Sequence, residues 1–197
     1  MAAPVTHLLY LHGFRSSPRS TKARFVAEWV ASHHPEVVWS CPALPASPLA
    51  AMRAIEDAID GWPHRSMAVI GSSLGGYYAT AVAERTGCRA VLLNPAVDPA
   101  RDLAAHVGTT TTWHERAPFE FKAAYVDELR ALAVPAITRP SRYHAVIAKG
   151  DEVLSWREMA GRYGGASIDL LEGGDHALSD FRAQWPAIVR FLGLDEA

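Results

Sequence analysis

Short apolar segments alternate along the chain with longer segments in which apolar residues recur every three or four positions. The short segments are rich in leucine and β-branched residues, as buried strands are, and the longer ones have the period of amphipathic helices. Strands are predicted at 7–12, 37–41, 67–72, 89–94, 144–149 and 167–172, and helices at 20–33, 49–60, 74–86, 155–163 and 179–192. This alternation predicts an α/β fold with about six mostly parallel strands, flanked by helices on both faces.

One stretch, from about 96 to 141, departs from this rhythm. It contains four consecutive threonines, several prolines and the aromatic residues Trp113, Phe119, Phe121 and Tyr125. We interpret it as a small cap inserted between two strands of a single domain spanning 1–197, because no linker or internal duplication divides the chain. The cap aromatics either line an apolar pocket or pack the cap onto the core, and the sequence leaves both interpretations open.

Composition narrows the class of protein. The 197 residues are 49% hydrophobic and 20% charged, with a formal net charge of −2, which suffices for one globular core. No apolar run approaches the roughly 18 residues of a membrane helix and no signal peptide is visible, so a cytoplasmic protein without membrane partners is expected. The lack of a basic run argues against nucleic acid as a partner. Cys41 and Cys88 are expected to be buried thiols, and the histidines lack the spacing of a metal site.

The segment AVIGSSLGGYY, at 68–78, carries the first specific chemical signal. Ser73 stands between Gly71 and Gly75 in a G-x-S-x-G pattern, after a predicted strand and before a predicted helix. In this context the pattern predicts a nucleophile elbow, a turn so tight that glycines are needed on both sides of a strained serine. Ser73 is therefore the candidate nucleophile, and Ser72 is expected to be structural.

A serine nucleophile needs a base within hydrogen-bond reach and a carboxylate that orients this base. In a fold with a nucleophile elbow, the acid and then the histidine follow the serine along the chain. Asp151 and His176 satisfy this order, and each comes just after a predicted strand, at the edge where open α/β sheets bind ligands. Asp98, after the fourth strand, is a competing acid, whereas Asp175 is disfavoured because it is adjacent to His176.

The loop after the first strand, which reads HGFRSSP, is expected at the same edge of the sheet. The backbone N–H groups of Phe14 and of Leu74, the residue after the candidate nucleophile, are predicted to form an oxyanion hole. His12 is expected to brace this loop rather than to carry protons. Arg15 and Arg19 are either solvated surface residues or a binding site for a phosphate-bearing leaving group such as coenzyme A.

Several motifs occur together in a characteristic order. They are YLHGF, SSPRSTKA, GSSLGGYYAT, NPAV, GDEVL and GGDHA, followed by FLGL near the C-terminus. Over nearly the whole chain they resemble the YqiA-type bacterial esterases of the α/β-hydrolase superfamily. The resemblance implies a compact α/β-hydrolase fold and a small cytoplasmic esterase or acyl thioesterase without a large lid. It places the nucleophile on Ser73, the acid on Asp151 and the base on His176, while the divergent insertion leaves substrate specificity undetermined.

The sequence thus predicts a serine hydrolase that cleaves a small-molecule ester or thioester, with acyl-CoA among the candidates, and that needs no cofactor. The alternative is a non-catalytic α/β-hydrolase scaffold that binds a small ligand and a protein partner, because a fold alone does not fix a function. Turnover of an activated ester would separate the two hypotheses. Neither the natural acyl chain nor the oligomeric state follows from the sequence.

Overall fold

A parallel sheet forms the centre of the computed structural model, which describes residues 4–113 and 115–195. Its six strands lie in the order β2-β1-β3-β4-β7-β8, and all neighbouring pairs are parallel. The strands are β1 (His7–Leu11), β2 (Val38–Ser40), β3 (Met67–Ser72), β4 (Arg89–Leu93), β7 (Tyr143–Ala148) and β8 (Ser167–Leu171). The predicted number and parallel direction of the strands are confirmed.

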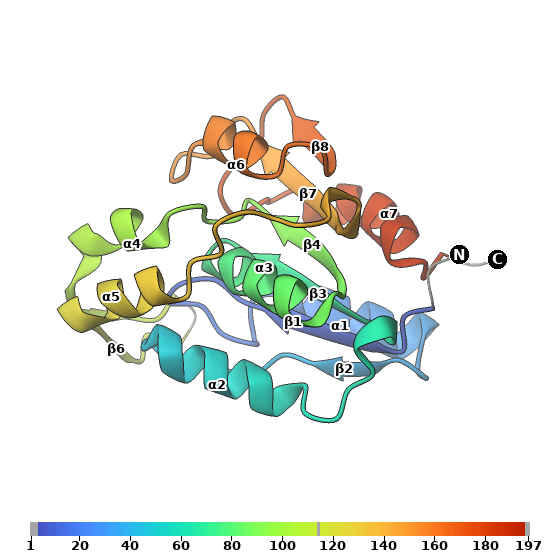
Figure 1. Cartoon of the computed structure of the whole chain (residues 1–197), viewed down its shortest axis with the longest axis horizontal. Helices are drawn as coiled ribbons and strands as arrows, with labels where there is room; N and C mark the ends of the chain where they lie inside the picture. The colour runs from blue at the N-terminus through green and yellow to red at the C-terminus, as the bar shows by residue number, and fades with distance from the viewer. Residues whose placement is uncertain (1–3, 114, 196–197) are drawn as a thin grey trace.

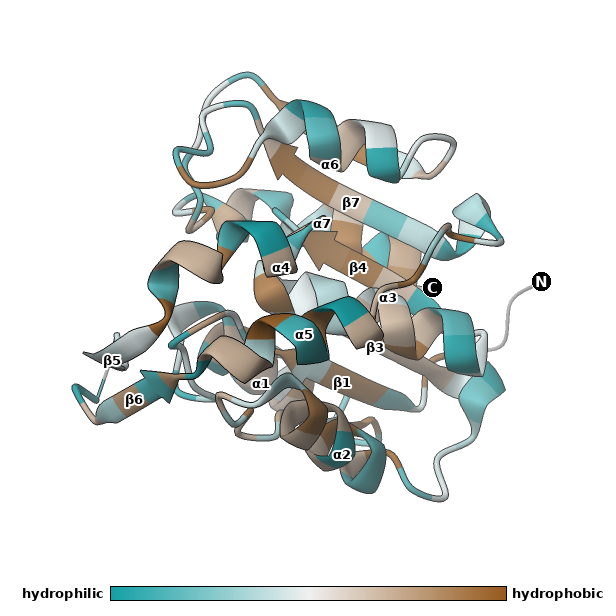
Figure 2. Cartoon of the chain, turned by 60° about the vertical axis from the view of Figure 1, so that its left-hand side comes forward, coloured by the Kyte–Doolittle hydropathy of each residue, from teal (hydrophilic) through white to brown (hydrophobic). Residues whose placement is uncertain are grey.

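Helices cover both faces of this sheet (Figure 1). One face carries α1 (Thr21–His33) and α7 (Phe181–Leu192), and the other carries α2 (Pro48–Ala58), α3 (Leu74–Thr86) and α6 (Trp156–Arg162). Successive strand residues point to opposite faces, so Tyr10 joins the core under α1 and α7 while Leu9 and Leu11 join the other core. Burial on both faces explains the nearly continuous apolar runs of the central strands β1, β3, β4 and β7, and β4 and part of β7 are brown in Figure 2.

The helix boundaries follow local capping chemistry. Ser20, Ser47 and Ser155 each accept a hydrogen bond from a backbone N–H in the first turn of α1, α2 and α6. Helices α3 and α7 end at Gly87 and Gly193, which adopt the left-handed conformation that glycine tolerates. No helix within the described ranges is long and apolar enough to cross a membrane.

The segment between β4 and β7 forms the cap. It contains α4 (Pro99–Asp102), the antiparallel hairpin of β5 (Gly108–Thr111) and β6 (Pro118–Phe121), and α5 (Ala123–Ala131). Short 3₁₀ turns occupy His64–Ser66, Ala104–His106 and Pro140–Arg142. The hairpin projects at one side of the molecule beyond α4 and α5 (Figure 2).

The cap aromatics divide between the two roles that the sequence left open. Phe121 is buried, and the rings of Phe119 and Tyr125 pack against the same core. Trp113, in contrast, is 57% exposed and lines a pocket beneath the cap. Most of these rings therefore fasten the cap, and Trp113 faces the space between cap and sheet.

Candidate active site

Ser73 occupies the turn between β3 and α3 with φ 55° and ψ −119°. Residues other than glycine rarely adopt such a backbone conformation, so the surrounding structure must hold Ser73 in it. The Ser73 N–H donates to the carbonyl of Leu93 at 2.9 Å, and the Ser73 carbonyl accepts from the N–H groups of Gly76 and Ala96 at 2.9 and 3.0 Å. Strand β4 and the first turn of α3 thus fix the strained residue.

The two glycines of the elbow are required by close packing of backbone on backbone. A Cβ atom added to Gly75 would lie 2.0 Å from the carbonyl oxygen of Leu11, and one added to Gly71 would lie 2.3 Å from that of Gly75. Backbone atoms in a packed sheet cannot move aside for a methyl group. The elbow is therefore pressed against the end of β1, and only glycine fits at either position.

Three side chains from the loops after β3, β7 and β8 form a continuous hydrogen-bonded series. Ser73 Oγ lies 2.9 Å from Nε2 of His176, and Nδ1 of His176 lies 2.8 Å from Oδ2 of Asp151. The side chain of Asp151 is fully buried, and that of His176 is 21% exposed. The structure therefore brings together a hydroxyl, an imidazole and a carboxylate that the sequence separates by up to 103 positions.

The candidate acid, Asp151, is held by its own loop. Its second oxygen, Oδ1, accepts hydrogen bonds from the N–H groups of Val153 and Leu154 at 2.8 and 2.7 Å, which compensates for burying the carboxylate of Asp151. A Cβ atom on Gly150 would lie 2.3 Å from the carbonyl oxygen of Gly174. The acid loop and the histidine loop therefore touch through their backbones, which fixes the separation of the two side chains.

Asn94, the residue after β4, makes hydrogen bonds to the histidine loop that the sequence analysis did not identify. It is fully buried and has φ 40°. Its side-chain amide donates to the carbonyls of Asp175 and His176 at 3.0 and 3.2 Å and accepts from the N–H of Ala148 at 2.8 Å. The available signal was a polar residue, of a type that tolerates positive φ, directly after an apolar strand.

The competing carboxylates have other partners. Asp98 caps α4 by accepting from the N–H of Arg101 at 3.2 Å. Asp175 accepts from the N–H and hydroxyl of Ser179 at 2.9 and 2.6 Å, and these hydrogen bonds hold the pKa of its carboxyl below the usual value. The carboxylate on Nδ1 of His176 is that of Asp151. Within residues 4–113 and 115–195, no group of three His, Cys, Asp or Glu side chains is arranged to hold a metal ion.

A pocket of about 440 Å³, here named the cap pocket, opens beside Ser73 and His176. Its other walls are mostly apolar and include Ala96, Pro99, Leu103, Trp113, Val153 and Leu154. Phe14 and Leu74 line it as well, and neither of their N–H groups donates a hydrogen bond to a described residue. A Cβ atom on Gly13 would lie 3.3 Å from Cβ of Ser73, so the loop after β1 passes directly beside the serine.

This loop is braced from both sides. Nε2 of His12 accepts a hydrogen bond from the N–H of Leu44 at 3.1 Å, and Nδ1 lies 3.0 Å from the carbonyl oxygen of Gly13. The ring of Phe14 meets those of Phe119 and Phe121 edge to face, with centroids 5.2 and 5.3 Å apart. His12 thus has the bracing contacts that the sequence analysis expected, and the cap holds the other side of the loop.

The two arginines of the loop lie in different surroundings. Arg15 has φ 58° and lines the cap pocket, where its Nε donates to the carbonyl of Thr111 at 2.7 Å and its guanidinium lies 3.8 Å from the ring centroid of Trp113. The side chain of Arg19 is 78% exposed and lies 3.5 Å from Glu115. Arg15 therefore joins the loop to the cap hairpin, and Arg19 belongs to the surface.

Comparison with known proteins agrees with this architecture. Residues 7–193 match the model of an uncharacterised protein family, UPF0227. Among solved structures, a putative hydrolase from Agrobacterium vitis S4 has a TM-score of 0.73 and 18% identity, covering 96% of this chain and 91% of that chain. The corresponding values are 0.70, 14%, 94% and 90% for mouse alpha/beta hydrolase domain-containing protein 10, and 0.71, 13%, 97% and 89% for ferulic acid-bound Est1E from Butyrivibrio proteoclasticus. At these identities the likeness establishes the fold, which is that of the α/β-hydrolases.

Proposed function

Because the chain belongs to the UPF0227 family, the YqiA-type family that its motifs resemble, and has the α/β-hydrolase fold, we propose that it is a serine hydrolase of carboxylic esters or acyl thioesters. The observation that carries this proposal is the unbroken hydrogen-bonded series from Ser73 through His176 to the buried Asp151. Such a series activates a hydroxyl that is otherwise a poor nucleophile.

The proposed reaction has two halves. In the first, Ser73 Oγ attacks the carbonyl carbon while Nε2 of His176 accepts the serine proton, and the histidine then donates that proton to the departing alcohol or thiol. In the second, water attacks the acyl-enzyme, His176 accepts a proton from the water, and the carboxylic acid leaves as Ser73 regains its proton. Asp151 keeps Nδ1 of the imidazole protonated, so that Nε2 is free to act as the base.

Negative charge develops on the substrate oxygen in both halves. We propose that the N–H groups of Phe14 and Leu74 bind this oxygen, because both residues line the cap pocket beside Ser73. Leu74 is also the first residue of α3, whose N-terminal end carries the positive end of the helix dipole. Bracing of the loop by His12 and by the cap aromatics keeps the Phe14 donor in place before substrate binds.

The walls of the cap pocket favour an apolar acyl group, with Leu103 and Leu154 on its surface. For the leaving group we propose that acyl-CoA thioesters are accepted. Arg15 lines this pocket and uses one of its five N–H donors on Thr111. Its charge, together with that of the exposed Arg19, would attract the phosphates of coenzyme A to the pocket mouth.

The test of the proposal is turnover together with covalent labelling. Purified protein mixed with p-nitrophenyl butyrate should release a burst of p-nitrophenol, and a fluorophosphonate should label Ser73, as located by peptide mass spectrometry. The matched control is Ser72→Ala, which should still be labelled, whereas Ser73→Ala should not. Ligand binding without turnover and without labelling of Ser73 would instead favour the non-catalytic scaffold.

A further inference from the structure

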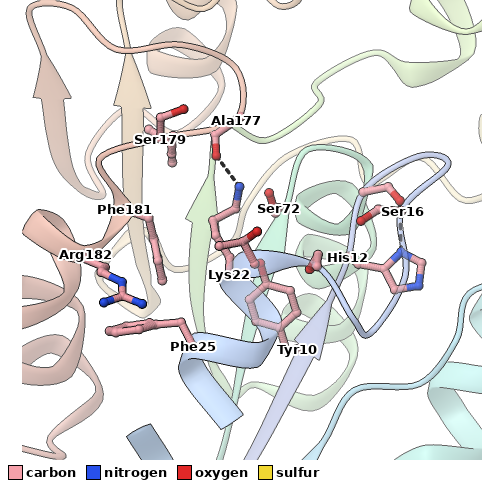
Figure 3. A pocket seen from close by; sticks show the side chains of 14 residues that line it. Tyr10, His12, Ser16, Lys22, Phe25, Ser72, Ala177, Ser179, Phe181 and Arg182 are labelled. Atoms are coloured by element: carbon pink, nitrogen blue, oxygen red, sulfur yellow. Dashed lines mark hydrogen bonds between the residues drawn. The ribbon is translucent and has the colours of Figure 1, made fainter. Parts of the chain in front are cut away.

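A second pocket, of about 400 Å³, lies at the same sheet edge but on the face covered by α1 and α7 (Figure 3). We name it the α1–α7 pocket. Its walls include Ser72 and Ala177, the chain neighbours of Ser73 and His176, yet it shares no lining residue with the cap pocket. Apart from His12, whose ring braces the loop of Phe14, the side chains of its lining have no role in the mechanism proposed above.

Lys22 places a cation in the wall of this pocket. The residue is only partly exposed, and its ammonium donates a hydrogen bond to the carbonyl of Ala177 (Figure 3). An ammonium has three N–H donors, and no carboxylate of the described residues lies within ion-pair distance of this one. Burial lowers the pKa of Lys22, and the charge of nearby Asp175 opposes that effect. The protein therefore supplies Lys22 with one acceptor and with no direct counterion among the described residues.

Tyr10 adds a second donor to the same wall. The residue is fully buried, and its hydroxyl lies near Ser72 but makes no hydrogen bond of acceptable geometry with a described residue. Buried polar groups are nearly always paired, so this hydroxyl retains a donor that an acceptor on a bound ligand would satisfy. The two donors come from different elements, since Lys22 belongs to α1 and Tyr10 to β1.

The remaining walls define the body of the ligand. Phe25, Leu178 and Phe181 provide apolar surface, and the guanidinium of Arg182 lies 5.0 Å from the ring centroid of Phe25. The wall carries two cations, Lys22 and Arg182, and the anionic Asp175 near Lys22 offsets one of these charges, which favours a singly charged ligand over a doubly charged group such as phosphate. The surroundings fit a single negative charge attached to an apolar group.

We propose that the α1–α7 pocket binds a small carboxylic acid as its carboxylate, with the oxygens at Lys22 and Tyr10 and the apolar body against Phe25 and Phe181. The acids that ester hydrolysis releases belong to this chemical class. The proposal concerns binding alone, and it stands whether or not Ser73 is a nucleophile.

Two tryptophans allow the binding position to be read directly. Trp185 packs on Phe25 and Phe181, with ring centroids 5.6 and 5.7 Å apart, whereas Trp113 lines the cap pocket. We would titrate ¹⁵N-labelled protein with sodium hexanoate and follow the indole resonances, assigned with Trp→Phe variants. The Trp185 signal should move and saturate, and neither hexanol nor inorganic phosphate should reproduce the change. A response at Trp113 alone, no response at all, or an equal response to phosphate would overturn the proposal.

Substitutions test the two donors. Lys22→Met should weaken hexanoate binding roughly tenfold or more, as loss of a charge-assisted hydrogen bond does. The matched control is Arg24→Met, which removes an exposed cation of α1 that does not line the pocket and should leave binding unchanged. Because Lys22 also tethers Ala177, Tyr10→Phe supplies a variant that removes no protein hydrogen bond. It should keep the thermal stability of the parent and bind hexanoate several-fold more weakly, and unchanged affinity in both variants would refute the assignment.

Discussion

The cap pocket and the α1–α7 pocket lie at one edge of the sheet, but they offer a ligand different chemical groups. The cap pocket is lined by Ser73 and by Phe14 and Leu74, whose N–H groups donate no hydrogen bond to a described residue, and its other walls are mostly apolar. The α1–α7 pocket holds the cation of Lys22 and the hydroxyl of Tyr10. The first is suited to bond cleavage and the second to holding an anion.

The partition between the two pockets is thin. Gly13 and Ser72 line the α1–α7 pocket, and Ser73 and His176 line the cap pocket, so adjacent residues of the same loops face different spaces. The partition has to be rigid if the two pockets are to keep separate chemistry. The strained elbow and the Asn94 hydrogen bonds provide that rigidity, and substitutions in the partition are the means to test the comparison.

The largest effect is expected from Ser73→Ala, which should lower ester turnover by about 10⁶-fold because a triad nucleophile is lost. Hexanoate affinity at the α1–α7 pocket should not change, since Ser73 does not line it. Initial rates with p-nitrophenyl butyrate and the Trp185 titration provide the two measurements. Ser72→Ala should lose far less activity, and equal losses in the two variants would contradict the elbow assignment.

Removing the charge of the acid should have the next largest effect. Asp151→Asn should reduce turnover roughly 10⁴-fold, because His176 loses the anion that orients it and selects its tautomer. Asp98→Asn is the matched control, and it should affect only the N-terminal hydrogen bond of helix α4. The same assay measures both variants, and the reverse ranking would transfer the acid role to Asp98.

Substitution of Asn94 should weaken the partition itself. Asn94→Gly removes three buried side-chain hydrogen bonds while tolerating φ 40°, so the free energy of unfolding should fall by about 2–4 kcal/mol. Asn94→Ala should lower the free energy of unfolding further, because alanine disfavours positive φ. Urea denaturation checks both values. An unchanged midpoint in both variants would show that the histidine loop does not depend on this amide.

Glu84, which lies on α3 and lines neither pocket, tests the stability of the fold separately from the two pockets. It accepts hydrogen bonds from Thr138 and Tyr143 and lies 3.8 Å from Arg142. Burial acts to raise the pKa of its carboxyl, but the hydrogen bonds and the Arg142 charge together hold it below its ordinary value of 4.5. The carboxylate therefore stabilises the fold at neutral pH, and that contribution is lost as the pH falls below about 4.5 towards the lowered value.

Glu84→Gln should accordingly cost about 1–2 kcal/mol of unfolding free energy at pH 7 and less near about pH 4. Urea denaturation at the two pH values measures the difference, and ester turnover and hexanoate binding serve as controls that should stay constant. A cost that is equal at both pH values would contradict the ionised role of Glu84.

The smallest effect concerns the mouth of the cap pocket. Arg15→Ala combined with Arg19→Ala should raise KM for an acyl-CoA thioester roughly threefold and leave a neutral ester of equal chain length nearly unchanged, with the difference shrinking in high salt. Arg15 also fastens the hairpin through Thr111, so Arg19→Ala alone separates charge from structure. Equal changes for both substrates would refute leaving-group binding.

Much of this architecture followed from local rules. The four central strands are buried on both faces, so their apolar runs are visible without knowledge of their neighbours. The elbow is a short motif whose glycines are required by packing within a few residues of Ser73 and against β1. The acid and the base could be proposed because parallel strands place the loops after them at one edge.

The features that could not be predicted depend on register between distant segments. The hydrogen bonds of Asn94 reach residues 54 to 82 positions away, and nothing near Asn94 in the sequence specifies them. The short helix α5 buries only Val126 and Leu129, too few apolar positions for a helical period to stand out. The sequence analysis did not single out Lys22, whose ammonium meets the histidine loop at the carbonyl of Ala177, 155 positions away.

The separation of 103 positions between Ser73 and His176 has a consequence for the order in which the molecule is made. A nascent chain that has emerged only as far as β7 contains Ser73 and both elbow glycines, but neither Asp151 nor His176. The proposed base, His176, arrives with the loop after β8, which is the last strand of the sheet in the sequence and lies at its edge. A serine-directed reagent would therefore report completion of the C-terminal part of the fold, and partly synthesised chains would remain unreactive while they wait for it.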